Sequence, residues 1–203
     1  MSDSYRSIRA GASARLTRER SRFVGLVFPA HDVASIEEIL RSVRREHHDA
    51  SHCPFAYRLL LGLETVERVD DDGEPRGTAG APILRELRSA EVLNLVAVVV
   101  RHFGGVKLGR GGLARAYAEA TRAALEGAAI AEIHRQVRVT VCFPAALGAR
   151  VMATVHRHRA RVVEVDYTHG GRLVALVSPS RSARFAADVE EATGGRARCE
   201  EAV

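Results

Sequence analysis

The sequence is poor in lysine and cysteine and has no tryptophan. Of its 30 Lys and Arg residues, only Lys107 is a lysine. In a chain that otherwise uses arginine, this lone lysine indicates that a compact ammonium is favoured over a planar guanidinium at that position. Cys53, Cys142 and Cys199 are far apart and form no CxxC pair, which predicts reduced, mostly structural thiols of a cytoplasmic protein.

Long apolar runs are also missing. The longest, Val92 to Val100, is interrupted by Asn94 and followed by Arg101, so it predicts a buried strand rather than a membrane span. The opening residues MSDSYRSIRAGAS contain no apolar segment of the kind found in secretion signals. We therefore expect a cytoplasmic protein with no membrane partner. We expect no cofactor, and the oligomeric state stays open.

Charge is segregated along the chain, whose net charge is +5. Residues 1–22 hold six arginines against two acids, residues 64–76 hold six acids against two arginines, and residues 101–115 hold four cations and no acid. This distribution predicts a flexible basic arm over residues 1–17 and a basic working face with an acidic loop near it. Such a face suits a polyanionic partner.

Hydrophobic periodicity divides the rest of the chain into two α+β domains, over residues 18–131 and 134–203. In the first we expect strands at 21–30, 55–63, 64–69 and 91–101, the last of them central. Helices are expected at 32–48, with Asp32 or Ser35 as N-cap, at 82–90 and at 113–127. In the second, the order strand 135–143, helix 145–158, hairpin 164–177, helix 181–193 and edge strand 196–203 is βαββαβ, the ferredoxin-like arrangement.

The glycine-rich segment 101–115 is the main candidate site. It joins the buried strand to a helix, whose first turn presents unpaired N–H groups and a partial positive charge. Cations gathered there repel one another unless an anion lies among them, and glycines let a backbone approach that anion closely. The candidate anion-binding residues are Arg101, His102, Gly104, Gly105, Lys107, Gly109, Arg110, Gly111, Gly112 and Arg115.

Other chemistries find weaker support. No GxxxxGK[ST] is present, and the GxGxxA match at 109–114 starts too far after its strand for a dinucleotide site. A Cys53–His102 dyad lacks an orienting third residue. The acidic loop lacks the regular ligand spacing of a calcium site, although its acids remain candidates for a base or a cation ligand and its threonine for an anion donor. These loop residues are Asp71, Asp72, Glu74 and Thr78.

Four segments together resemble the YigZ/IMPACT family. They are SRF at 21–23, His52 with AYR at 56–58, DDGEPRGTAGAPIL at 71–84 and VVVRHFGGVKLGRGGLARAY at 98–117. The resemblance covers residues 18–128, and it adds His52 and Tyr57 as possible site residues. The chain departs from the family at His102, where an aromatic residue, commonly tyrosine, is usual; stacking of a base there would be weaker or pH-dependent.

The resemblance implies a first domain like domain IV of elongation factor G and a second like its domain V. It also implies binding to RNA or the ribosome and a role in translation regulation, and it does not imply kinase activity. We assign no catalytic residue and no metal ligand. Two alternatives stay open: an enzyme acting on a phosphorylated small molecule or nucleotide through the same loop, and a protein–protein regulator of a translation factor. The eukaryotic relatives that regulate in this way carry an additional N-terminal domain, and here only a short arm precedes the shared one.

Overall fold

The computed structural model describes residues 3–62, 64–168 and 170–202. The chain divides into two compact units, one of Arg6–Glu132 and one of Met1–Tyr5 together with Ile133–Val203. A two-stranded sheet pairs β1 (Ser4–Ile8) with β7 (Ile130–His134), and the division between the units falls within both strands. Both units combine helices with antiparallel sheets, which confirms the predicted α+β class.

The larger unit is built on a five-stranded antiparallel sheet in the order β2-β3-β6-β4-β5. Its strands are β2 (Ala12–Arg18), β3 (Ser21–Pro29), β4 (Phe55–Leu61), β5 (Glu64–Asp70) and β6 (Leu95–His102). The predicted central strand β6 lies in the middle, where it is buried on both faces. Such two-sided burial accounts for its continuous apolar sequence, since no face needs polar side chains.

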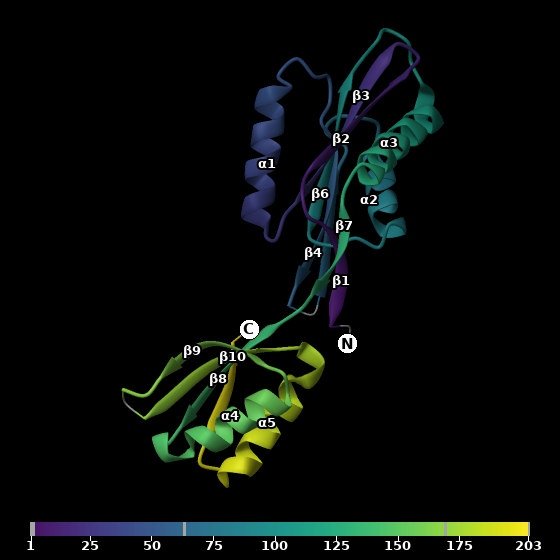
Figure 1. Ribbon diagram of the computed structural model, residues 1–203. Coiled ribbons are helices and arrows are strands. Elements are labelled where there is room, and N and C mark those ends of the chain that lie inside the picture. The colour runs from purple at the N-terminus through teal and green to yellow at the C-terminus, as the bar shows by residue number, and fades with distance from the viewer. Residues whose placement is uncertain (1–2, 63, 169, 203) are drawn as a thin grey trace. The chain divides into compact units, whose positions relative to one another are not determined.

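Helices cover both faces of this sheet (Figure 1). Helix α1 (Val33–Glu46) packs on one face, and α2 (Gly80–Ser89) and α3 (Gly109–Glu126) pack on the other. Side chains of β6 alternate between these layers, with Val98 in the α1 core and Val99 in the α2–α3 core. The predicted cap of α1 is confirmed, because the Asp32 carboxylate accepts a 2.7 Å hydrogen bond from the backbone of Ser35.

The expected basic arm is corrected by the structure. Residues 4–8 and 12–18 form β1 and β2 rather than a flexible segment. Strand β2 pairs with β3 from Ala12↔Val27 to Arg18↔Ser21, and its small or apolar residues pack against the α2–α3 core. The exposed Ser13, Arg15 and Thr17 alternate with these inward residues, and this period-2 pattern is a strand signal that the charge count concealed.

The smaller unit has the predicted ferredoxin-like order. Its sheet has the order β11-β8-β10-β9. The strands are β8 (Val137–Phe143), β9 (Arg161–Asp166), β10 (Gly171–Val177) and β11 (Arg198–Ala202). The helices are α4 (Gly148–Arg157), which follows a short 3-10 turn η1 (Ala145–Leu147), and α5 (Pro179–Thr193). Its separate core joins Val151 and Val155 of α4 to Phe185 and Val189 of α5. No helix of the described residues is long and apolar enough to cross a membrane.

Candidate functional site

The site forms where the end of β6 meets the start of α3. Helix α3 begins at Gly109, four residues before the start expected from its apolar pattern, so the second half of the glycine segment belongs to its first turn. The N-cap Leu108 makes no side-chain capping bond, and the first turn holds no acid. These first-turn N–H groups and the helix dipole therefore remain available to an anion.

A pocket of about 540 Å³ lies at this helix start. The glycine segment contributes Lys107 and Arg110, and the acidic loop contributes Glu74. His52, which precedes β4 and pairs with Arg101 of β6, also lines the pocket. The two loops thus face the same cavity, although about 30 residues separate them in the sequence. Its volume is within the range of pockets that hold small ligands. The lining is Ser51, His52, Glu74, Pro75, Arg101, Phe103, Lys107, Leu108, Gly109, Arg110 and Leu113.

Lys107 and Arg110 are the exposed cations of the pocket. No described carboxylate lies within ion-pair distance of Lys107. Arg110 donates a 2.8 Å hydrogen bond to the carbonyl of Arg76, which ties the helix start to the acidic loop. It forms no ion pair with a described carboxylate, but its charge is near enough to help lower the pKa of Asp71. Arg115 is exposed one turn further along α3 and does not line the pocket.

Arg101 lines the floor of the pocket, and its guanidinium is buried there rather than exposed at the rim. Its side chain is only 6% exposed, and its Nη1 donates a 2.5 Å hydrogen bond to the Glu74 carboxylate. The same carboxylate oxygen accepts a 2.6 Å bond from the hydroxyl of Tyr117. Burial, then the hydrogen bond to Glu74 and its charge, raise the pKa of Tyr117 above its ordinary value. The phenol is therefore a donor that fixes Glu74.

The acids of the loop are already engaged within the protein. Asp71 accepts bonds of 2.7, 3.0 and 2.9 Å from the backbones of Gly77, Ala79 and Gly80. It thereby caps α2, whose own N-cap residue offers no side-chain acceptor. Burial acts to raise the pKa of Asp71, but these three donors outweigh it and hold the pKa below its usual value.

Asp72 is engaged in the same way. Its carboxylate bonds the side chain of Arg44 at 2.8 Å and the backbone N–H of Cys53 at 2.6 Å. Together with the pairing of Glu74, these contacts leave no loop acid free to serve as a base. Among the described residues, no group of three or more His, Cys, Asp or Glu side chains is placed to hold a metal ion.

Thr78 and Gly104 also have structural contacts, which corrects their assignment to an anion site. Thr78 is buried and donates a 2.6 Å hydrogen bond to the carbonyl of Pro75. A Cβ on Gly104 would lie 2.1 Å from the backbone of Arg20. At Gly105 and Gly109, by contrast, φ is +88° and +67° and the space is open, a backbone that glycine adopts without strain. A Cβ on Gly111 would meet the Arg115 guanidinium at 3.5 Å and one on Gly112 the Cβ of Leu108 at 3.1 Å.

His52 is the histidine that faces the pocket. Its Nδ1 lies 2.7 Å from the carbonyl oxygen of Asp72. A carbonyl only accepts, so this contact places the proton on Nδ1 and leaves Nε2 as an acceptor in the neutral ring. Tyr57, by contrast, is buried in the α1 core and stacks with Phe55 at a centroid distance of 6.4 Å. Of these two candidates, His52 lines the pocket and Tyr57 does not.

His102 lies on the opposite face of the sheet from Arg101, which corrects its assignment to the anion site. Neighbouring residues of a strand point to opposite faces, and the His102 ring meets Asp49 at 3.5 Å and the ring of His47 at 6.3 Å. The aromatic residue beside the pocket is Phe103, which is 48% exposed. Sequence reasoning missed Phe103 because an apolar residue next to a strand is expected to be buried. The one sign of a functional role was its position between the strand and the glycine loop.

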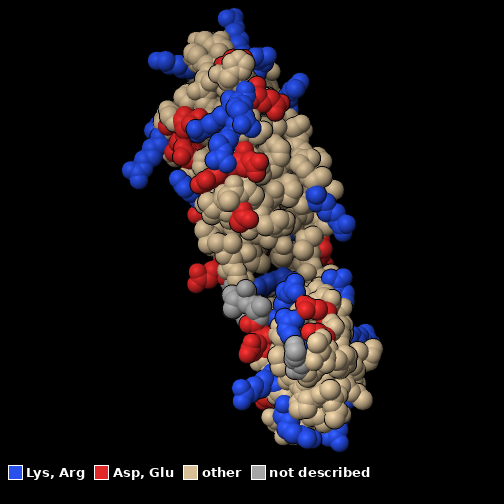
Figure 2. All heavy atoms as spheres, turned by 90° about the vertical axis from the view of Figure 1, so that its left-hand side faces the viewer, with Lys and Arg blue, Asp and Glu red and all other residues tan. Residues whose placement is uncertain are grey.

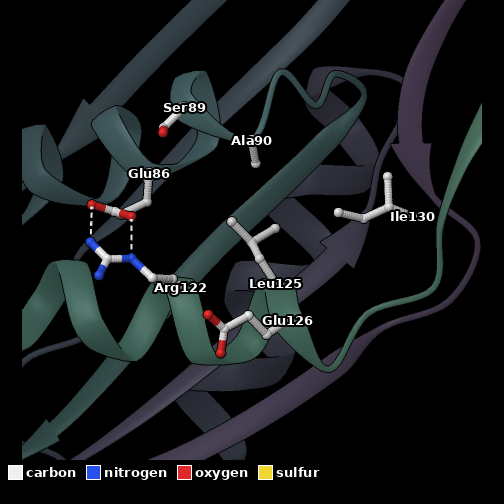
Figure 3. Close-up of a pocket in the computed structure, with 7 residues that line it drawn as sticks. All are labelled: Glu86, Ser89, Ala90, Arg122, Leu125, Glu126 and Ile130. Atoms are coloured by element: carbon white, nitrogen blue, oxygen red, sulfur yellow. Dashed lines mark hydrogen bonds and ion pairs between the residues drawn. The ribbon is translucent and has the colours of Figure 1, made fainter.

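A second hollow lies between α2 and α3 near their far ends (Figure 3). Its arginine, Arg122, makes two hydrogen bonds to the Glu86 carboxylate, of 3.0 and 3.2 Å. That charge is therefore neutralised within the protein, and no residue predicted for the site lines this hollow. The candidate site is the pocket at the start of α3.

Comparison with known proteins identifies a family, and its profile matches within the larger unit. The family profile described as the Impact N-terminal domain matches residues 19–125. The IMPACT family member YvyE of Bacillus subtilis is 33% identical over 132 residues, 65% of this chain and 60% of that protein. YigZ of Escherichia coli is 39% identical over 108 residues, 53% of each chain. An IMPACT family member of Thermus thermophilus is 36% identical over 162 residues, 79% of this chain and 86% of that one.

Solved structures match over both units. The crystal structure of a hypothetical protein has a TM-score of 0.72 and 27% identity, and the match covers 98% of this chain and 97% of that one. A crystal structure of a Thermus thermophilus protein has a TM-score of 0.54 at 12% identity, with 98% of this chain and 28% of that one covered, and supports the fold alone. The matches to YvyE and YigZ span between half and two thirds of those proteins.

Proposed function

The chain belongs to the IMPACT family, and we propose that it is an RNA- or ribosome-binding factor with a role in translation regulation. The observation that carries the proposal is the pocket at the start of α3, where Lys107 and Arg110 stand beside an uncapped helix N-terminus. Phosphate groups are the anions that such a terminus and its cations favour. Contacts of this kind position a nucleic acid without reading its sequence.

The face that includes α1 offers no continuous basic surface, because acidic and basic side chains of the larger unit are interspersed there (Figure 2). The exposed cations that the pocket itself offers to phosphates are Lys107 and Arg110. Each phosphate neutralised on a single strand contributes about −0.7 to the slope of log affinity against log salt concentration, so we expect a slope of only a few units.

Binding of a single-stranded RNA of mixed sequence, measured by fluorescence anisotropy over a range of salt concentrations, tests the proposal. Lys107→Gln and Arg110→Gln should each weaken binding at low salt and reduce the slope by about 0.7. The matched control is Arg41→Gln, which removes an exposed arginine from α1 on the other face of the sheet. If the unsubstituted protein binds neither RNA nor ribosomes at low salt, the proposal fails. Capture of a translation factor that survives nuclease would favour the protein–protein regulator instead.

One observation favours a second candidate, an enzyme acting on a phosphorylated small molecule or nucleotide. The acidic and glycine loops line one pocket, and His52 presents an acceptor nitrogen to it. Because the loop acids are engaged, His52 is the residue placed to accept a proton. Nucleoside monophosphates and sugar phosphates, assayed for release of inorganic phosphate, provide the test. We expect His52→Gln to abolish turnover and to leave binding within about threefold; absence of turnover with every compound would exclude phosphate-releasing chemistry.

A further inference from the structure

Phe103 is an exposed aromatic ring on a fixed backbone. Its side chain is 48% exposed at the edge of the pocket. Its backbone N–H donates a 3.1 Å hydrogen bond to the hydroxyl of Ser51, and the next N–H, of Gly104, donates one of 3.1 Å to Ser21. An exposed phenyl ring loses the free energy that its burial would contribute. The two backbone hydrogen bonds hold Phe103 in this exposed position. An exposed ring on an anchored backbone is suited to contact with a ligand.

The ring is backed by the floor of the pocket. The guanidinium carbon of Arg101 lies 5.2 Å from the centre of the Phe103 ring. The Glu74 carboxylate accepts a hydrogen bond from that guanidinium and so holds it in place. The Nε–H of Arg101, in a side chain only 6% exposed, has no hydrogen-bond partner among the described residues. Buried donors of this kind are rare in folded proteins, and an unpaired one in the lining of a cavity points to a ligand acceptor.

We propose that the pocket binds one unpaired nucleotide, with its base stacked on Phe103 and its phosphate at Lys107. This rests on the proposed function and names the part of the nucleic acid that the pocket takes. Stacking on an aromatic side chain needs a base whose faces are free, and bases within a duplex are stacked on one another. The ligand is therefore a nucleotide of a single strand or a free mononucleotide, which share this chemistry. Every base has a π-face, so selectivity among bases is weak.

The test uses the full chain and a short single-stranded RNA with 2-aminopurine at one position. Fluorescence of this base is quenched when it stacks. We expect quenching with the unsubstituted protein, and Phe103→Leu should remove it and weaken binding about tenfold. Phe103→Trp should preserve binding. The matched control is Val106→Ala, which shortens another exposed apolar side chain of the same loop. Circular dichroism shows whether each variant is folded.

Three further ligands separate the possible outcomes. An oligonucleotide of the same length with abasic sites should bind about tenfold more weakly than the complete RNA, and Phe103→Leu should not weaken it further. A duplex should bind no better than the abasic strand. If complete and abasic strands bind equally, or Phe103→Leu leaves both quenching and affinity unchanged, the nucleotide inference is overturned while phosphate binding stands.

The free mononucleotide AMP identifies the source of the ligand. Binding of AMP that is lost with Phe103→Leu, in a protein that binds no RNA, would support the nucleotide pocket and overturn the proposed RNA function. Binding of RNA that depends on Phe103, without binding of AMP, would assign the pocket to a nucleotide within a strand. Failure of both ligands to bind at low salt would overturn the inference itself.

Discussion

Asp71 shows how one side chain of the acidic loop serves the fold rather than the chemistry. Its carboxylate accepts three backbone hydrogen bonds at the start of α2, from Gly77, Ala79 and Gly80. From sequence alone the same residue was a candidate base or cation ligand, because a carboxylate in a glycine-rich loop fits both roles. Only the positions of these backbone donors distinguish a cap from a catalyst.

We expect Asp71→Asn to lower the free energy of unfolding at pH 7 by about 1–2 kcal/mol, since the amide keeps one acceptor oxygen and loses the charge. The folded-state pKa of Asp71 lies below its unfolded value, so its contribution is present above the unfolded pKa of about 4 and is lost as the pH falls through the folded value. The difference between the two proteins should therefore shrink in acid.

Urea denaturation followed at pH 7 and at pH 3 measures both effects. The control is Glu38→Gln, which neutralises an exposed carboxylate on α1. A difference that stays constant or grows between pH 7 and pH 3 would contradict the assignment of the charged carboxylate as the cap.

Helix α3 lies unusually close to the sheet at the scale of whole elements. A Cβ on Gly25 of β3 would lie 2.1 Å from the carbonyl oxygen of Ala120. Alanines at 116, 120 and 124 line the helix face that meets this strand. The sequence predicted this apolar face, and the small size of its residues sets how closely the helix approaches. The same contact positions the start of α3, and with it Lys107 and the pocket.

We expect Gly25→Ala to destabilise the larger unit by about 2–3 kcal/mol, because the added methyl group must displace the helix backbone. The control is Gly127→Ala at the end of α3, where φ is −79° and the added Cβ has its nearest contact at 3.6 Å. Thermal unfolding measures the change. Equal melting temperatures for the two variants would show that α3 does not depend on this close approach.

At the scale of the whole molecule, each unit has its own core. The core of the smaller unit includes no residue of the larger one. Residues at the start of the chain nevertheless belong to the smaller unit, where Asp3 accepts hydrogen bonds from the backbone and hydroxyl of Ser180 at the start of α5. These bonds lower the pKa of Asp3. Sequence reasoning assigned this region to a flexible arm because nothing in a linear reading connects residues 3 and 180.

The sequence by itself determined the fold class, the ferredoxin-like order of the second unit and the glycine segment with Lys107 as the segment of interest. These follow from hydrophobic periodicity and from residue types, which are local properties. Tertiary structure decided which side chains of that segment remain available to a ligand. Arg101 and Glu74 neutralise each other, His102 turns to the other face, and Phe103 stays exposed. Ion pairing, burial and the face of the sheet to which a side chain points depend on residues far apart in the chain. No local sequence pattern therefore contains them.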